Sequence, residues 1–326
     1  MTQHRAVLAA PVEALPEDRT PESGPIAILP EPTDTLEAAV LAGGGTVAEL
    51  SGSTRGLVWR DFGRGADLAA VLDAHPSIGW VQLPLAGVER FARTLSDHPG
   101  VLWTSAKGAF AQPVAEHALA LALALLRQLP KRILATSWGD SSGTSLYGLR
   151  VLIVGAGGIA HELISLLRPF GVTVTVVRRG PGEVPGADRT VTAEHFLDVL
   201  PEADVVVIAA AATAETRNLV GETELRIMKD TAILVNIARG SLVDTDALAG
   251  ALASRQIAGA GLDVTNPEPL PDGHPLWEEP NAIITPHTAD TPEMVEPLLA
   301  ERVRANVAAF LGDGRFEGRV DPVAGY

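Results

Sequence analysis

The sequence contains no cysteine and few aromatic residues. The absence of cysteine among its 326 residues excludes disulfide bonds, thiolate metal sites and a cysteine nucleophile. We expect no metal site, and a chain without thiols is typical of a reducing compartment such as the cytoplasm. Aromatic residues make up only 4% of the chain, so aliphatic side chains must build its cores.

Long apolar runs and an excess of basic residues are also missing. The most apolar run covers residues 118–126, whereas a membrane-spanning helix needs about 20 residues. Residues 1–23 lack a signal-peptide core and are rich in Pro, Glu and Ala, which predicts a loose tail. The net charge of −15 argues against nucleic acid or an anionic membrane as a partner.

From Gly24 onward the sequence alternates short apolar runs with helical patterns. Several runs are rich in Val and Ile, as expected of parallel strands that are buried on both faces. We therefore predict an α/β fold with two Rossmann-like, doubly wound parallel-sheet domains and a cleft between them. The predicted strands cover residues 26–29, 57–59, 80–82, 151–154, 172–177, 205–209, 232–235, 259–262 and 282–284.

Two helical patterns mark the domain boundaries. Pro113 opens an apolar helix with the sequence VAEHALALALALLRQL, because proline is favoured in the first turn of a helix. A last helix, from about 294 to 310, has one apolar face and is expected to return to the first block. This organisation predicts a discontinuous domain, 1–112 with 290–326, and a continuous domain, 113–289.

A glycine-rich loop follows the first predicted strand of the continuous domain. It reads GAGGIA over residues 155–160, between a strand and a helix, which is the context that the GxGxxA dinucleotide motif requires. Gly155 allows the tight turn, and Gly157 lets the backbone approach a pyrophosphate at the helix N-terminus. We predict that Gly158 and Ile159 also contact the cofactor, and that the continuous domain binds the dinucleotide.

Two arginines occupy the position that distinguishes the two nicotinamide dinucleotides. An NAD site carries an acidic residue at the end of the next strand, where it binds the ribose 2′-hydroxyl. Here that strand ends in Arg178 and Arg179, whose planar guanidinium groups suit a 2′-phosphate. We therefore expect NADP, as NADPH, to be preferred and NAD to be possible. The alternative is a pair of solvated surface arginines.

Three later strands are each followed by a residue with useful chemistry, namely Arg239, Glu268 and His287. Ligands of open α/β sheets bind outside the carboxyl ends of the strands, so these residues can converge beside the nicotinamide. Arg239 would hold a substrate carboxylate, and His287 would give a proton to a carbonyl oxygen as hydride reaches its carbon. Glu268 would fix the tautomer of His287 and stabilise its imidazolium form.

Taken singly, each of these residues has a plainer interpretation. Arg239 could pair with Asp244 or Asp246, Glu268 could lie on the surface of a proline-rich loop, and His287 could cap the following helix. Their position at successive strand ends, behind a dinucleotide loop, favours catalysis.

Together these stretches resemble the D-isomer-specific 2-hydroxyacid dehydrogenases, and the arginine pair resembles their NADPH-preferring glyoxylate and hydroxypyruvate reductases. The resemblance covers the chain from about Gly24 and rests on the stretches VGAGGIA, NIARGSLVDTDAL, GAGLDVTNPEPLPDGHPLW, ITPHTA, WVQLPLAGVE and VAEHALALALAL. It implies an NAD(P)-dependent oxidoreductase that transfers a hydride between the nicotinamide and a small 2-keto or 2-hydroxy acid. It also implies a homodimer formed through the nucleotide domain, with the discontinuous domain binding substrate.

The resemblance extends to single residues. Arg239, Glu268 and His287 match the catalytic set of the family. The loop Leu85-Ala86-Gly87 is similar to the segment whose backbone N–H groups help bind the substrate carboxylate, and Arg60 stands where a second cation could lie. Further cofactor contacts are expected from Ala210, Thr216, Ala238 and Asp263. The sequence departs from the family at Ala160, the third position of the glycine motif, and in the alanine run 209–212.

Two other functions are open on the same scaffold. A formate or phosphonate dehydrogenase would have no 2-keto acid substrate, and formate oxidation needs no proton relay, so the pair of Glu268 and His287 fits it less well. A non-catalytic, nucleotide-sensing protein of the corepressor kind would keep the fold and the cofactor. The presence of all three catalytic residues counts against it, and turnover of 2-keto acids would discriminate between these functions.

Overall fold

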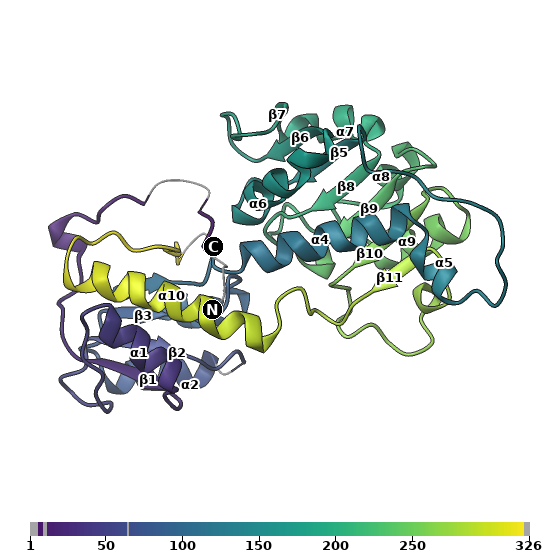
Figure 1. The fold of residues 1–326 in the computed structure, drawn as a ribbon. Coiled ribbons are helices and arrows are strands. Elements are labelled where there is room, and N and C mark those ends of the chain that lie inside the picture. The colour runs from purple at the N-terminus through teal and green to yellow at the C-terminus, as the bar shows by residue number, and fades with distance from the viewer. Residues whose placement is uncertain (1–5, 9–11, 64, 323–326) are drawn as a thin grey trace. The chain divides into compact units, whose positions relative to one another are not determined.

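The computed structural model describes residues 6–8, 12–63 and 65–322, and the chain divides into two compact units. Unit 1 comprises Met1–Phe110 and Thr291–Tyr326, and unit 2 comprises Ala111–Asp290. Each unit is built on one parallel sheet with helices packed against it (Figure 1). The predicted boundaries, after residues 112 and 289, lie close to these divisions.

The sheet of unit 1 has four parallel strands in the order β1-β2-β3-β4. These strands are β1 (Ile26–Leu29), β2 (Gly56–Trp59), β3 (Trp80–Gln82) and β4 (Leu102–Thr104). The helices are α1 (Asp34–Ala42), α2 (Gly65–Ala74), α3 (Ala92–Asp97) and α10 (Pro292–Leu311). The last helix packs against α1, as Figure 1 shows, so both ends of the chain build this unit.

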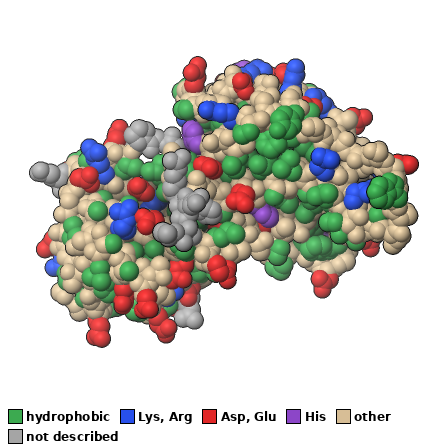
Figure 2. Space-filling model, viewed as in Figure 1, with side chains coloured by type: hydrophobic (Ala, Val, Ile, Leu, Met, Phe, Trp, Pro, Cys, Tyr) green, Lys and Arg blue, Asp and Glu red, His purple; other side chains and the backbone are tan. Residues whose placement is uncertain are grey.

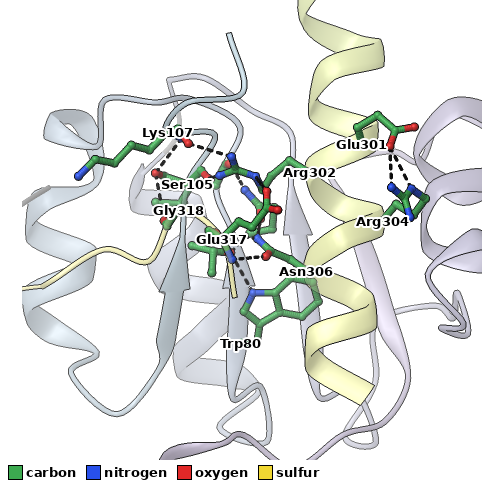
Figure 3. A network of polar contacts seen from close by, with 12 residues as sticks. Trp80, Ser105, Lys107, Glu301, Arg302, Arg304, Asn306, Glu317 and Gly318 are labelled. Atoms are coloured by element: carbon green, nitrogen blue, oxygen red, sulfur yellow. Dashed lines mark hydrogen bonds and ion pairs between the residues drawn. The ribbon is translucent and has the colours of Figure 1, made fainter. Parts of the chain in front are cut away.

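A buried arginine on α10 holds the C-terminal segment in unit 1 (Figure 3). Arg302 donates hydrogen bonds to the carbonyl oxygens of Ser105 and Lys107, both at 2.8 Å, and its Nε lies 3.0 Å from a carboxylate oxygen of Glu317. Burial lowers the pKa of the Arg302 guanidinium, and the charge of Glu317 opposes that shift. Beside it Asn306 accepts a hydrogen bond from the backbone N–H of Glu317. One helix thereby fastens two loops of unit 1.

The loose N-terminal tail stays a prediction, but two of its described residues contact unit 1. Leu15 donates a backbone hydrogen bond to Gly314 at 3.0 Å, and Glu22 forms an ion pair with Arg55 at 3.1 Å. These contacts attach the segment to unit 1 although its composition is that of a flexible chain. Residues 1–5 and 9–11 of the predicted tail lie outside the described residues.

The sheet of unit 2 has seven parallel strands in the order β11-β10-β9-β8-β5-β6-β7. From β5 the chain first adds strands on one side and then returns to add strands on the other. The direction therefore reverses between β5 and β8, where open α/β sheets bind ligands. The strands are β5 (Arg150–Val154), β6 (Thr173–Arg178), β7 (Arg189–Thr192), β8 (Val205–Ile208), β9 (Ile233–Asn236), β10 (Gly259–Leu262) and β11 (Ala282–Ile284).

The helices of unit 2 begin with α4 (Ala111–Leu126), which packs on α6, β9, β10 and β11. Its predicted extension through Leu129 is wrong, because Gln128 adopts a left-handed backbone with φ 53° and the chain turns there. No helix in the described part of the chain is long and apolar enough to cross a membrane. The other helices are α5 (Leu129–Ile133), α6 (Gly158–Leu167), α7 (Phe196–Val199), α8 (Glu222–Ile227) and α9 (Thr245–Ala253).

Candidate active site

The glycine loop lies between β5 and α6, at the reversal point of the unit 2 sheet. Gly155 has φ +118°, and a Cβ atom added there would lie 2.4 Å from the carbonyl oxygen of Ala209, so only glycine fits. Gly157 is the N-cap of α6, and a Cβ added to it would meet nothing within 4 Å. The helix therefore begins without a side-chain cap and beside open space. Its first N–H groups can bind an anion, which suits the pyrophosphate of a dinucleotide.

The carboxyl end of β6 carries positive charge beside this loop. Arg178 is the last residue of the strand, and its Nη1 donates to the carbonyl oxygen of Gly182 at 3.3 Å. His161, in the first turns of α6, has its pKa lowered by burial and by the charge of Arg178. Arg179 follows and is exposed. An anionic group here would meet the positive charge of the arginines and the backbone N–H groups at the start of α6.

The other predicted cofactor residues lie in the loops after β8 and β9. Ala210 follows Ala209, whose carbonyl oxygen is close to Gly155. Thr216 closes a compact turn, since its hydroxyl donates to the carbonyl oxygen of Ala211 at 2.8 Å. Ala238 is buried, and its N–H donates to the side chain of Asn236 at 3.1 Å.

The structure brings His287 and Glu268 together at the carboxyl ends of β10 and β11. His287 Nδ1 lies 2.7 Å from Glu268 Oε1, and both side chains are about half exposed. Because a carboxylate can only accept, Nδ1 carries the proton and donates it. The other ring nitrogen, Nε2, is thereby left for a reacting group. His287 itself has a left-handed backbone, with φ 52°.

Arg239 lies in the loop after β9, and this loop approaches the next one closely. A Cβ atom added to Gly240 would lie only 1.8 Å from the carbonyl oxygen of Thr265, so the loops after β9 and β10 touch at a glycine. The carbonyl oxygen of Arg239 accepts from the Asn236 side chain at 3.0 Å, and its Nη1 donates to Ala238 O at 2.7 Å. The loop backbone that carries the guanidinium group is therefore held beside the loop that begins with Asp263.

The buried carboxylate of Asp263 holds the loop that carries His287. Its Oδ1 accepts from the hydroxyl of Thr285 at 2.6 Å and from the N–H of Thr288 at 2.9 Å, and its Oδ2 accepts from the N–H of Ala289 at 3.1 Å. Its backbone oxygen accepts from the N–H of His287 at 2.9 Å. These contacts fix the His287 loop, and the predicted contact of Asp263 with the cofactor stays a prediction.

Comparisons with known proteins identify the family of the chain. The family model "D-isomer specific 2-hydroxyacid dehydrogenase, NAD binding domain" matches residues 119–289. A glyoxylate reductase from Aeropyrum pernix is 32% identical over 264 residues, 77% of either chain. The mouse glyoxylate reductase/hydroxypyruvate reductase is 33% identical over 267 residues, 79% of this chain and 78% of the mouse chain. The chain belongs to the D-isomer-specific 2-hydroxyacid dehydrogenases.

Solved structures of such dehydrogenases share the architecture. One is a D-isomer-specific 2-hydroxyacid dehydrogenase from Xanthobacter autotrophicus Py2, solved in complex with NADPH and MES. It is 26% identical, covers 94% of this chain and 100% of its own, and superposes with a TM-score of 0.80. The prediction of two parallel-sheet domains is confirmed. The protein is an NAD(P)-dependent oxidoreductase that acts on small 2-keto or 2-hydroxy acids.

The remaining predicted site residues of the dehydrogenase lie in unit 1. Leu85, Ala86 and Gly87 form the loop after β3, where the carbonyl oxygen of Leu85 accepts from Ala106 N at 2.9 Å. Arg60 directly follows β2, and its guanidinium donates to the carbonyl oxygen of Glu31. Their roles toward substrate stay predictions.

One plainer interpretation of the dehydrogenase residues is contradicted. Thr291 is the N-cap of α10, so His287 does not cap the following helix. Asp244 caps α9 by accepting from Ala247 N, and Asp246 faces His274 at 3.4 Å.

Residues that the sequence did not single out complete this region. Asp290 has its pKa raised chiefly by burial and further by the charge of Asp263, while the charges of His287 and Arg239 oppose the shift. His117, on α4, lies 3.0 Å from the hydroxyl of Thr285. His117 belongs to the stretch VAEHAL, whose pattern predicts a helix and resembles a family motif but assigns no role to the histidine.

Proposed function

We propose that this dehydrogenase reduces a small 2-keto acid of the glyoxylate or hydroxypyruvate type, with NADPH as the preferred reductant. The hydrogen bond between His287 and Glu268 carries the proposal. It sets an acid with a fixed tautomer at the carboxyl ends of β10 and β11, in the unit that also contains the dinucleotide loop. The two glyoxylate reductases described above support the choice of substrate class.

Each residue has one role in this reaction. The bound nicotinamide supplies the hydride. Arg239 binds the substrate carboxylate, because a guanidinium presents two parallel N–H donors to two oxygens. His287 gives the proton from Nε2 to the carbonyl oxygen, and Glu268 keeps its carboxylate on Nδ1 while the ring changes charge. Leu85, Ala86, Gly87 and Arg60 are proposed to bind the substrate from unit 1.

The preference for NADPH rests on the charge around Arg178. Burial, and secondly the charge of Arg178, lower the pKa of His161, so the charge at the end of β6 extends to the start of α6. A 2′-phosphate at the end of β6 would be attracted by the charge of the arginines, whereas a neutral 2′-hydroxyl would not. Arg178 and Arg179 stand at the end of β6, where an NAD site would carry an acidic residue.

We also propose that the dehydrogenase is a cytoplasmic homodimer formed through unit 2. The segment from α5 to Tyr147 exposes large apolar side chains, with Trp138 at 94%, Ile133 at 79% and Leu134 at 77% exposed. Figure 2 shows apolar side chains, in green, gathered on the surface of unit 2. Exposed apolar clusters of this kind mark protein interfaces, and a second copy of the chain is the proposed partner.

The initial rates of NADPH and NADH oxidation with glyoxylate, hydroxypyruvate, pyruvate and phenylpyruvate test the proposed reaction. We expect turnover with at least one 2-keto acid, faster with NADPH. In parallel, His287→Ala should still bind NADPH but lose about 10²–10⁴-fold in kcat, the usual contribution of proton transfer. Absence of turnover with every 2-keto acid, while NADPH still binds, would contradict the proposal and favour a sensor. Full activity of His287→Ala would contradict the role of the histidine.

A further inference from the structure

His117 is a polar residue on a largely apolar helix, and its side chain faces two catalytic loops. Its Nε2 lies 3.0 Å from Thr285 Oγ1, which follows β11, and 3.5 Å from Asp263 Oδ1, which follows β10. The side chain of Asp263 is only 1% exposed, and that of His117 is partly buried. Polar groups buried under a helix must satisfy one another, because water cannot.

The direction of the hydrogen bonds follows from the number of protons. Thr285 Oγ1 and Asp263 Oδ1 are 2.6 Å apart, the short distance of a hydroxyl that donates to a carboxylate. A hydroxyl has a single proton, so Thr285 can only accept from His117. The proton of His117 is therefore on Nε2. The chain of donors runs from His117 to Thr285 and ends on Asp263.

Asp263 connects these hydrogen bonds to His287, because it also binds the loop that carries the histidine. The same oxygen, Oδ1, also accepts from the N–H of Thr288, and Oδ2 accepts from the N–H of Ala289. The backbone oxygen of Asp263 accepts from the N–H of His287, so the aspartate holds the loop at and after the histidine. A non-glycine residue with φ 52° needs such contacts, since the left-handed conformation is unfavourable for a residue with a side chain.

We propose that His117 is a positioning residue of the dehydrogenase. By fixing the hydroxyl of Thr285 on Asp263, it sets the orientation in which His287 transfers its proton. Its polar contacts are with Thr285 and Asp263, and His117 acts on His287 through those two residues. The inference rests on the proposed function, in which His287 is the acid.

Three variants of the full-length protein test the chain of contacts. His117→Phe keeps a ring but removes the donor, His117→Gln restores an N–H near the position of Nε2, and Thr285→Val removes the hydroxyl at nearly constant shape. We expect His117→Phe and Thr285→Val to lower kcat about 10- to 100-fold, as a misplaced catalytic group does, with KM and the Kd of NADPH nearly unchanged. His117→Gln should recover most of kcat.

Two comparisons separate positioning from a general loss of structure. The double variant of His117→Phe and Thr285→Val should lose no more than the worse single variant, because both interrupt one chain. His195→Phe is the matched control, since His195 is exposed and follows β7, at the opposite edge of the sheet from β11. Unchanged kcat in His117→Phe and Thr285→Val, or losses that simply add, would overturn the proposal.

A readout without turnover keeps this inference separate from the proposed function. In protein labelled with ¹⁵N-histidine, the ring signals of His287 report its hydrogen bond to Glu268, and those of His117 report the proton on Nε2. We expect His117→Phe to shift the His287 signals and His195→Phe to leave them in place. If the wild type turns over no 2-keto acid but the His287 signals shift in His117→Phe, the proposed reaction is wrong and the proposed role of His117 is still supported. Unshifted His287 signals would overturn the positioning itself.

Discussion

The two arginines at the end of β6 are the residues that we propose to determine the choice of cofactor. Replacing Arg178 and Arg179 with alanine should raise the Kd of NADPH about 10- to 100-fold, because the loss of one charge-assisted hydrogen bond to the 2′-phosphate costs roughly 1.5–3 kcal/mol. The Kd of NADH should change less than about threefold. Fluorescence titration with both cofactors measures the two constants. Equal losses would show that the arginines do not contact the 2′-phosphate.

The protonation of Asp290 makes the stability of the folded protein depend on pH. Burial raises the pKa of its carboxyl above the value in the unfolded chain, so the folded state binds the proton more tightly. Its contribution to stability is therefore complete below the unfolded pKa and is lost as pH rises through the folded pKa. Asp290→Asn removes this loss, and we expect its Tm to exceed that of wild type by roughly 2 °C near neutral pH. The difference should vanish near pH 3, and thermal unfolding across pH 3–8 measures it. A lower Tm at neutral pH would contradict the prediction.

Gly240 is where two catalytic loops touch. Gly240→Ala would place a Cβ atom 1.8 Å from the carbonyl oxygen of Thr265, so the backbone must move and stability should fall by about 1–3 kcal/mol. Gly250→Ala is the matched control. A Cβ there meets nothing within 4 Å, and the position lies inside α9, where alanine is favoured by about 1 kcal/mol. Urea unfolding should therefore shift in opposite directions, and equal shifts would contradict the close approach.

Among single residues, those that the sequence predicted lie after the ends of strands. Glu268 and His287 each follow a buried strand, and a parallel sheet brings such ends together, so their hydrogen bond was foreseeable. His117 was not, because a lone histidine on an apolar helix has no motif and its partner Thr285 is 168 positions away. The raised pKa of Asp290 depends on burial, which no spacing encodes.

Among the elements, α10 depends on its buried arginine. Arg302→Met would leave Glu317 and two loop carbonyl groups without their partner, and we expect a loss of about 3–5 kcal/mol in the free energy of unfolding. Arg304→Met, two residues on, is the matched control. Its exposed ion pair with Glu301 should contribute at most about 1 kcal/mol (Figure 3). Urea unfolding followed by tryptophan fluorescence compares the two variants. Equal losses in the free energy of unfolding would contradict the role of Arg302.

The elements that the sequence predicted are those with several consecutive apolar residues. Strands such as β8, with the sequence VVVI, are buried on both faces and carry a clear signal. The prediction missed β4 (LWT) and β7 (RTVT), which are short and lie at sheet edges, where one side needs no pairing partner. The end of α4 was placed too late because a left-handed glutamine, Gln128, has no compositional signature.

For the whole molecule, the proposed dimer makes the next prediction. Size-exclusion chromatography with light scattering should give twice the chain mass of 34.0 kDa for wild type. Ile133→Ser combined with Trp138→Ser should shift the mass towards one chain, because these side chains expose 79% and 94% of their surface and would be buried by a partner. A monomeric wild type, or a double variant that still dimerises, would contradict the proposed contact.

Unit 1 is assembled from both ends of the chain, and this sets an order of events during synthesis. Residues up to Phe110 leave the ribosome first, but the helix that covers α1 begins only at Pro292. At 5–20 residues per second the interval lasts roughly ten to forty seconds. Throughout it the apolar face of the nascent α1 has no partner helix, while unit 2 is synthesised as one contiguous stretch and is complete before Pro292 is added. The unit made first is therefore the last to fold, and it is the part that a chaperone would need to shield.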